Sequence, residues 1–488
     1  MTVESLSALL PYMILGAAAV AVMLSISFYR NHNVAAFTTA AGMALAFISL
    51  PIAGAAGTRQ VTPLLRADDF ALFYTGLILV AGFVVAILSY SYLKSRGNRN
   101  EEYYVLLLCA TLGAALLTAS THFASLFLAL EILSVSLYAM IAYPRTQSNS
   151  IEAAVKYLVL AAGSAAFLLF GMALVYAETG TMDFVRIAAV RNGLDQSENL
   201  ILLVGMALMT VGIGFKLALA PFHWWTPDVY QGAPAPVTAF IATASKGAMF
   251  AVLLRFFTQV DVHTYPSLFT LFAVIAIVSM FVGNLLALLQ RNVKRILAYS
   301  SIAHLGYLLV SFLASGPLAA TAAAFYLVSY FLTTLGAFGI VTLLSGAERD
   351  ADDIEDYRSL FWRRPWVATL FTTILLSLAG IPLTAGFVGK FYILAAGEAS
   401  ARWISVIMLV INSAIGLFYY LRIVVAMCAP IPESTENTVG SRSCATAISL
   451  LGGAAVSAVT LALVWVGVYP APLIRLVESL VTGRAVLP

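Results

Sequence analysis

The feature that most constrains this chain is a series of apolar runs, each about twenty residues long and almost free of charge. Residues 267–289, SLFTLFAVIAIVSMFVGNLLALL, are one example. A helix of about twenty apolar residues spans the roughly 30 Å hydrocarbon core of a bilayer. Of the 488 residues 61% are hydrophobic and 10% charged, too few polar residues to cover a water-soluble domain. A β-barrel would show alternating segments of about ten residues, so the sequence predicts an all-α integral membrane protein.

Hydropathy divides the chain into about fourteen transmembrane helices. The N-terminal run carries Glu4 and no Lys or Arg before it, which is untypical of a signal peptide and predicts a retained first helix. The predicted spans are residues 8–28, 34–54, 70–93, 103–120, 123–143, 152–177, 200–222, 234–257, 267–289, 295–314, 319–345, 365–394, 403–427 and 445–468.

Basic residues are unevenly distributed between the two sides of the predicted bundle. Loops on the side of the N-terminus hold eight arginines, and those on the opposite side hold fourteen Lys or Arg residues. Because cytoplasmic loops carry the excess of basic residues, we expect both termini to lie outside the cytoplasm.

Charge, cysteines and motifs exclude several functions. The net charge of +3 is too small to indicate a nucleic-acid partner. Cys109, Cys428 and Cys444 form no CxxC pair and fit no metal or iron–sulfur pattern. No GxGxxG or Walker motif lies in a strand–helix context. We therefore expect no nucleotide, metal or redox cofactor bound by this chain.

Ionisable residues inside the apolar spans are the best candidates for a functional site, since each costs about 2.5–3.5 kcal/mol at the bilayer centre. Such residues in membrane helices mark ion pathways and proton relays. The candidates are Glu131, Lys216, Lys246 and Lys390, with His223 and His304 as two further titratable side chains.

Two interpretations of these charges are open. In the first, they pair with one another and lock helices together. In the second, they relay protons, because a buried lysine without a partner tends to lose its proton and can then pass protons on. Three deep lysines against one glutamate leave cations in excess, which favours the relay. Lys156 is a weaker candidate, because it lies near a predicted helix start and its side chain can reach the interface.

Two of the lysine-bearing helices contain helix-breaking residues. Lys216 is followed by Pro221, and the stretch SLAGIPLTAGFVGK places Gly380 and Pro382 before Lys390. Proline removes a backbone donor and glycine loosens the turn, so both helices are predicted to be interrupted. Interrupted helices at membrane depth are typical of ion sites in transporters.

The spacing of the candidates indicates an internal repeat. Glu131 and His304 are 173 residues apart, and Lys216 and Lys390 are 174 apart, in each case five predicted spans. Because five is odd, the second copy enters the membrane from the other side, which predicts two inverted five-helix repeats and two half-channels. The predicted division is residues 1–102 with three helices, 103–258 with helices 4–8, 259–428 with helices 9–13, and 429–488 with the last helix.

Three stretches carry a resemblance that covers essentially the whole chain. They are PFHWWTPDVYQGAPAPV (221–237), RNVKRILAYSSIAHLGYLL (291–309) and SLAGIPLTAGFVGKFY (377–392). With LLPYMILG near the N-terminus, they make the chain similar to the subunit N family of the bacterial proton-pumping NADH–quinone oxidoreductase, respiratory complex I. The first stretch is specific to the broader group of complex I and Mrp-type antiporter subunits.

The resemblance implies a proton-translocating subunit, a translocase without a redox site of its own, in the cell inner membrane with periplasmic termini. Its partners would be the other membrane subunits of complex I and the lipid bilayer, while NADH, FMN, iron–sulfur clusters and quinone would belong to other subunits. In the implied relay, Glu131 pairs with Lys216, Lys246 links the half-channels, and Lys390 serves the far channel. His223 and His304 match positions along the same hydrated axis.

Three rival interpretations remain. The nearest is a subunit of an Mrp-type cation/proton antiporter or a membrane-bound hydrogenase, which would use the same lysines and be distinguished by its neighbouring genes. A purely structural scaffold would tolerate neutralisation of Lys216 without loss of pumping. A stand-alone solute transporter is disfavoured, since no cluster suits a specific substrate.

Overall fold

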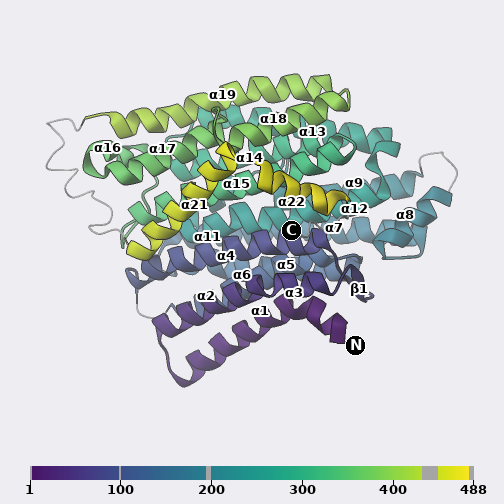
Figure 1. Cartoon of the computed structure of the whole chain (residues 1–488), viewed down its shortest axis with the longest axis horizontal. Helices are drawn as coiled ribbons and strands as arrows, with labels where there is room; N and C mark the ends of the chain where they lie inside the picture. Colours follow the sequence, from purple (N-terminus) through teal and green to yellow (C-terminus); the bar gives the residue numbers. More distant parts are fainter. Residues whose placement is uncertain (1–2, 98–99, 194–198, 431–448, 483–488) are drawn as a thin grey trace. The chain divides into compact units, whose positions relative to one another are not determined.

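The computed structural model describes residues 3–97, 100–193, 199–430 and 449–482, and most of them are helical (Figure 1). Thirteen helical spans in this part of the chain are long and apolar enough to cross a membrane. The remaining predicted span, 365–394, is divided between two shorter helices, α17 (Pro365–Ala379) and α18 (Ala385–Ala399). The predicted all-α membrane fold is therefore confirmed. Arg99, Arg442, Arg484 and Cys444 lie outside the described residues.

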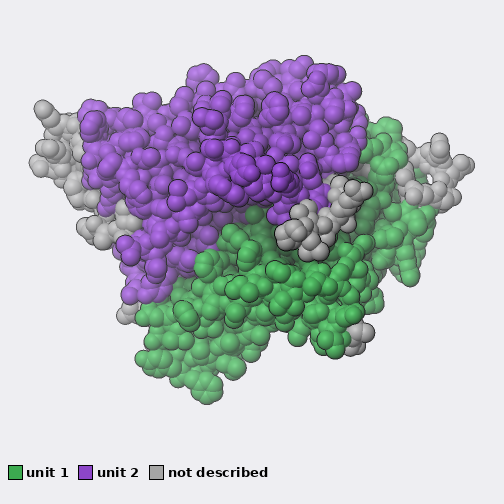
Figure 2. Space-filling model, viewed as in Figure 1, with its two compact units in different colours: residues 1–83, 101–225, 244–275 green, residues 84–100, 226–243, 276–488 purple. Residues whose placement is uncertain are grey.

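The chain forms two compact units, coloured in Figure 2. The first comprises residues 1–83, 101–225 and 244–275. Its elements are α1 (Val3–Phe28), α2 (His32–Ile48), α3 (Leu50–Ala55), an antiparallel pair β1 (Arg59–Thr62) and β2 (Leu65–Ala67), the first part of α4 (Asp69–Lys94), α5 (Glu102–Ala119), α6 (Phe123–Ile141), α7 (Ser148–Thr179), α8 (Phe184–Gly193), α9 (Leu200–Leu217), α12 (Lys246–Val260), the short η2 (Val262–Thr264) and the first part of α13 (Pro266–Leu288).

The second unit comprises residues 84–100, 226–243 and 276–488. Helices α14 and α15 form its core, since 94% and 89% of the residues in their most apolar stretches are buried inside the protein. The division between the units falls inside the π-helical turn η1 (Ile241–Ser245). The second unit holds the ends of α4 and α13, α10 (Trp225–Gly232), α11 (Ala235–Phe240), α14 (Val293–Leu313), α15 (Pro317–Leu344), η3 (Ile354–Tyr357), α16 (Leu360–Arg363), α17, α18, α19 (Trp403–Cys428), α21 (Leu450–Val468) and α22 (Ala471–Thr482).

Polar N-cap residues set where many of the helices begin. Their side-chain oxygen or nitrogen accepts a hydrogen bond from a backbone N–H in the first turn, which has no partner within the helix. These polar residues therefore mark helix starts in the sequence. The N-caps are Asn31, His122, Asn199, Asn292, Thr384 and Ser449.

Matching contacts inside the two units support an internal repeat. In the first unit the N-cap His122 of α6 forms a β-bridge with Asp183. In the second, the N-cap Asn292 of α14 bridges Asp353, and both residues lie 170 positions later. The glycines that let neighbouring helices approach follow the same interval. A Cβ on Gly113 would lie 2.7 Å from the backbone nitrogen of Leu133, and one on Gly283 would lie 2.6 Å from that of Ala303.

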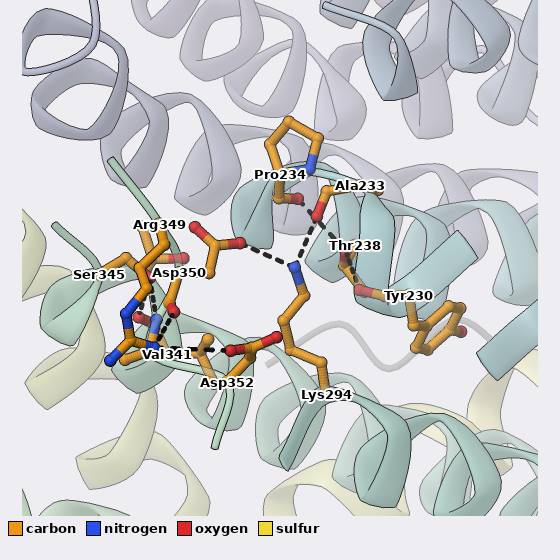
Figure 3. A network of polar contacts seen from close by, with 12 residues as sticks. Tyr230, Ala233, Pro234, Thr238, Lys294, Val341, Ser345, Arg349, Asp350 and Asp352 are labelled. Atoms are coloured by element: carbon orange, nitrogen blue, oxygen red, sulfur yellow. Dashed lines mark hydrogen bonds and ion pairs between the residues drawn. The ribbon is translucent and has the colours of Figure 1, made fainter. Parts of the chain in front are cut away.

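The second unit contains a buried ion cluster (Figure 3). The Asp350 carboxylate binds Lys294 Nζ at 2.7 Å, Arg96 at 2.8 Å and the Tyr92 hydroxyl at 2.8 Å. Burial alone would raise the pKa of Asp350, but the charges of Lys294 and Arg96 hold the pKa of this carboxyl at about 2. Lys294 also donates to the Ala233 carbonyl at 2.7 Å. The start of α14 therefore fixes the connection between α10 and α11.

A second buried ion pair joins three helix ends of the first unit. Arg255 in α12 donates to both carboxylate oxygens of Asp68, at 2.7 and 2.8 Å, and to the Thr118 carbonyl at 3.1 Å. Its guanidinium lies 4.6 Å from the centre of the Phe70 ring. Burial alone would raise the pKa of Asp68, but its hydrogen bonds with Arg255 lower this pKa below its usual value.

We expect Arg255→Met to destabilise the protein by about 3–5 kcal/mol, because it leaves the Asp68 carboxylate buried without its main partner. Arg66→Met is the matched control: Arg66 contacts the same carboxylate at 3.3 Å but is 37% exposed, so its loss should cost under about 1 kcal/mol. Thermal unfolding of the purified complex in detergent measures both. The contribution of Asp68 should be full above the usual carboxyl value of 3.8 and fall as the pH drops below it. Equal losses in the two variants would contradict the assignment.

Candidate functional site

Helix α9 ends at Leu217, one residue after Lys216. Ala218 adopts the left-handed conformation, and the amide of Leu219 reaches back to the Gly214 carbonyl at 2.8 Å. The indole of Trp225 donates to the Phe215 carbonyl at 2.9 Å. The predicted interruption before Pro221 is therefore confirmed. The indole is a second donor to the Phe215 carbonyl, which also accepts from the Ala218 amide at 2.9 Å.

The break between α17 and α18 uses the same backbone motif 162 positions later. Gly380 is left-handed, and the amide of Ile381 reaches back to the Leu376 carbonyl at 3.0 Å. Across the break, the Gly386 amide donates to Ser377 Oγ at 3.1 Å. A Cβ on Gly386 would lie 1.8 Å from the Ser377 carbonyl oxygen, so only glycine permits this contact.

Lys216 meets a tyrosine rather than a carboxylate. Its side chain is 5% exposed, and Nζ donates to the Tyr157 hydroxyl at 2.9 Å and lies 5.1 Å from the centre of that ring. Glu131 on α6 is half-buried and interacts electrostatically with both Tyr157 and Lys216. Tyr157 on α7 is thus the direct partner of the amine, and the predicted Glu131–Lys216 pair is an electrostatic interaction without a direct ion pair among the described residues.

Lys246 is fully buried and follows a distortion that the sequence analysis did not anticipate. The predicted span 234–257 is α11, then the π-helical turn η1, then α12, whose first residue is Lys246. Single π-helical turns inside α-helices occur often at functional sites.

Lys390 occupies the carbonyl end of the broken helix α17. Its Nζ donates to the carbonyls of Leu378 at 3.0 Å and Ala379 at 2.8 Å, and to Ser413 Oγ at 2.9 Å. Gly380 leaves room for the amine, because a Cβ there would lie 3.0 Å from Nζ. All three ammonium protons therefore have acceptors, two of them at a helix C-terminus that favours positive charge.

The two histidines have different surroundings. His304 on α14 is 4% exposed and bonds two tyrosine hydroxyls, Tyr326 to Nδ1 at 2.6 Å and Tyr420 to Nε2 at 3.1 Å. His223 lies in the link between α9 and α10, stacked on Trp224, and its buried Nδ1 has no hydrogen-bond partner among the described residues. His304 therefore belongs to a hydrogen-bonded cluster, whereas His223 does not.

The remaining charged candidates are accounted for by ion pairs. Lys156 is 45% exposed and pairs with Glu152 one turn earlier at 2.7 Å. Asp228 on α10 pairs with Arg295 at 2.8 Å, next to a hydrogen bond from Arg295 to Gln231. Asp228 thus shapes the connection between the half-helices.

The spacing that indicated the repeat does not mark equivalent positions. The structural interval of 170 residues between α6 and α14 puts the counterpart of Glu131 at residue 301, almost one turn before His304. Lys216 precedes its helix break, whereas Lys390 follows its own by ten residues. The two lysines therefore occupy different positions relative to the helix breaks in the two copies of the repeat.

The sequence analysis missed the tyrosines that contact the candidate lysines and His304. Tyr157, Tyr326 and Tyr420 contact Lys216 or His304, and Tyr307 lies 5.4 Å below the Lys390 amine. The available signal was a polar aromatic residue deep in an apolar span, since a buried tyrosine hydroxyl usually has a hydrogen-bond partner. Among the described residues no group of three or more His, Cys, Asp or Glu could hold a metal ion.

Comparison with known proteins agrees with this architecture. Residues 120–416 match the family described as NADH:quinone oxidoreductase/Mrp antiporter, TM. NADH-quinone oxidoreductase subunit N of Methylococcus capsulatus (strain ATCC 33009 / NCIMB 11132 / Bath) is 47% identical over 478 residues, covering 97% of this chain and 95% of that protein. A chain of respiratory complex I from Thermus thermophilus with bound Aureothin has a TM-score of 0.81 and 33% identity, over 95% of this chain and 98% of that one.

More distant structures share the fold alone. A chain of the Mrp complex from Dietzia sp. DQ12-45-1b has a TM-score of 0.86 at 19% identity, over 99% of this chain and 98% of that one. A chain of an archaeal membrane-bound sulfane sulfur reductase has a TM-score of 0.81 at 24% identity, over 98% of each chain. Since the closer relative matches nearly end to end, the chain belongs to the subunit N family of the NADH–quinone oxidoreductases.

Proposed function

We propose that this chain is the antiporter-like, proton-translocating membrane subunit of respiratory complex I and that Lys216, Lys246 and Lys390 carry its protons. NADH, FMN, iron–sulfur clusters and quinone are bound by other subunits, whose electron transfer drives the pump. One observation carries the proposal. Each of the three lysines is buried and lies beside an interruption of its helix, at Ala218, at η1 or at Gly380.

The difference between Lys216 and Lys390 supports a direction for transfer. Burial weakens the hold of an amine on its proton. Lys216 has one hydroxyl acceptor, whereas Lys390 has three acceptors, two of them helix-terminal carbonyls. An ammonium group thus has more acceptors at Lys390 than at Lys216, which fits Lys216 as the group that releases a proton and Lys390 as the group that receives it.

Glu131 supplies the control at the start of this path. Two unit charges about 4 Å apart in an effective dielectric near 20 interact by about 4 kcal/mol. Bringing the Glu131 carboxylate toward or away from Lys216 would thus change the proton affinity of the amine by a factor of about a thousand. Tyr157, which is hydrogen-bonded to Lys216 and electrostatically linked to Glu131, transmits this change.

The outward face of α6 supports association with a neighbouring subunit. Glu131 is only half-buried, and its neighbours Leu128, Ile132 and Val135 are 60%, 40% and 59% exposed. A carboxylate facing hydrocarbon would cost about 2.5–3.5 kcal/mol. Another membrane subunit of the complex covers this face, and its charges bias Glu131. The complex lies in the cell inner membrane.

Lys216→Ala should abolish most proton pumping in an otherwise assembled complex, because it removes the first amine of the path. Proton uptake by inverted membrane vesicles during NADH oxidation measures this, with assembly checked on native gels. Lys156→Ala is the matched control, since this lysine is exposed and paired with Glu152. Normal pumping by assembled Lys216→Ala complex would leave the buried charges as structural ties.

Tyr157→Phe should slow pumping by about fivefold, the effect of losing one hydrogen bond, while the complex assembles normally. The ring that packs on Phe215 and Trp225 is retained, so the change is confined to the hydroxyl. Initial pumping rates at several pH values measure it. An unchanged rate and pH profile would show that Glu131 acts on Lys216 without Tyr157.

Cysteine labelling tests the orientation, in which both termini face the periplasm. In a chain whose native cysteines are replaced by serine, Arg186→Cys should react with a membrane-impermeant maleimide in intact cells. Arg145→Cys, on the side richer in basic residues, should react only after the inner membrane is opened. The reverse pattern would invert the assignment.

A further inference from the structure

The N-cap of α6 is a histidine, so a ring nitrogen rather than an oxygen caps this helix. His122 has an extended backbone, and the amide of Ala124 donates to its Nδ1 at 3.1 Å. Because a backbone N–H can only donate, Nδ1 must be without a hydrogen, and the hydrogen of the ring must lie on Nε2. The cap of α6 is therefore neutral His122.

Acid removes this cap. Protonated histidine carries a hydrogen on both ring nitrogens, so the imidazolium form of His122 has no acceptor for the Ala124 amide. The dipole of the helix also opposes a positive charge at its N-terminus. Histidine is the side chain that ordinarily changes charge between about pH 5 and 8. The hydrogen bond that caps α6 is therefore sensitive to pH in that range.

The second unit has a matching cap without a titratable group. Asn292, the N-cap of α14, lies 170 positions after His122. The two residues form equivalent β-bridges, one to Asp183 and the other to Asp353. The Asn292 Oδ1 accepts from the Arg295 amide at 3.0 Å, and an amide oxygen stays an acceptor throughout this pH range. Acid can therefore open the start of α6 but not that of α14.

The first turn of α6 joins several segments of the first unit. The Phe123 amide donates to the Met182 carbonyl at 3.0 Å, in the link between α7 and α8. The Ser125 hydroxyl donates to the Leu64 carbonyl at 2.8 Å, in the turn between β1 and β2. Glu131 lies eight residues after Phe123, just over two turns along the same helix. Loosening of the first turn therefore weakens the support of the helix that carries Glu131.

The charged groups around His122 are engaged elsewhere. Those of the neighbouring segments are Asp183 in the α7–α8 link, Arg186 on α8, Arg66 on β2, and Asp68 with Arg255. The Asp183 carboxylate accepts from the Arg186 amide at 2.9 Å, and the Asp68 carboxylate binds both arginines that approach it. No ion pair in the part of the chain that the structure describes includes His122, which is half-buried. Its charge therefore follows the pH of the solvent at this end of α6.

We propose that His122 is a pH-sensitive cap of α6 that slows proton pumping when the periplasm becomes acidic. Protonation of the imidazole breaks the hydrogen bond with Ala124 and loosens the first turn, and the position of Glu131 relative to Lys216 changes with it. In the proposed orientation the turn between α5 and α6 faces the periplasm, which receives the pumped protons, whereas Asn292 faces the cytoplasm. The inference rests on the proposed function and on this orientation.

Hydrogen exchange of backbone amides in the purified complex measures the cap directly. The first turn of α14, capped by Asn292, is the internal reference, so the intrinsic effect of pH on exchange cancels. In the wild type we expect the ratio of exchange rates, α6 over α14, to rise by about fivefold between about pH 8 and about pH 5, the effect of one lost N-cap. The ratio should stay constant in His122→Asn, which keeps an acceptor that does not titrate. In His122→Ala it should be raised at both pH values.

Proton pumping measures the consequence. Initial rates are compared in inverted vesicles, whose lumen is the periplasmic side, with either the lumen or the medium acidified. His263→Asn is the matched control, since His263 is an exposed histidine on the same proposed side, with its ring 5.7 Å from that of Phe269. Acid in the lumen should slow the wild type and His263→Asn by up to about fivefold more than His122→Asn. Acid in the medium should slow all three equally.

Each other outcome has a defined meaning. A constant exchange ratio in the wild type would overturn the inference, and so would equal slowing of the wild type and His122→Asn by acid in the lumen. If His122→Ala does not assemble, the comparison of the wild type with His122→Asn, which retains a cap, decides alone. Normal pumping by Lys216→Ala would instead remove the proposed function, and the exchange ratio does not depend on that result.

Discussion

Carbonyl groups freed by a broken helix must find donors inside the membrane, and the rest of this site depends on how they do so. In hydrocarbon no water is available, and each unsatisfied backbone group costs several kcal/mol. In the first unit the indole of Trp225 donates to the carbonyl of Phe215. In the second, the amine of Lys390 takes those of Leu378 and Ala379. Both breaks contain the same left-handed turn, but the donor to the exposed carbonyls is an uncharged indole in the first unit and a lysine amine in the second.

This difference accounts for the different hydrogen-bond partners of Lys216 and Lys390 in two units with similar backbones. Because Trp225 satisfies the end of α9, Lys216 is left to a single tyrosine and to the field of Glu131. Because Lys390 satisfies the end of α17, its charge is part of what holds the break together. Helix-terminal carbonyls thus surround the Lys390 amine, whereas the Lys216 amine faces a single hydroxyl and the charge of Glu131.

The sequence predicted the fold well because its strongest signals are local. Runs of apolar residues define the spans, and Pro221, Gly380 and Pro382 mark the breaks. The site was predicted only by residue type. Charged residues in apolar helices are visible in the sequence, but the tyrosines that contact them come from other helices, and the π-helical turn before Lys246 leaves no recognisable local pattern.

The intervals between candidate residues show the limit of reading function from spacing. Intervals of 173 and 174 residues indicated a repeat, yet the backbone repeats at 170 near α6 and α14 and at 162 at the breaks. The backbone bridges of His122 with Asp183 and of Asn292 with Asp353 help to hold the fold together, so they occur in both copies. Titratable side chains carry the chemistry, and they can move by a turn or across a break while the backbone stays the same.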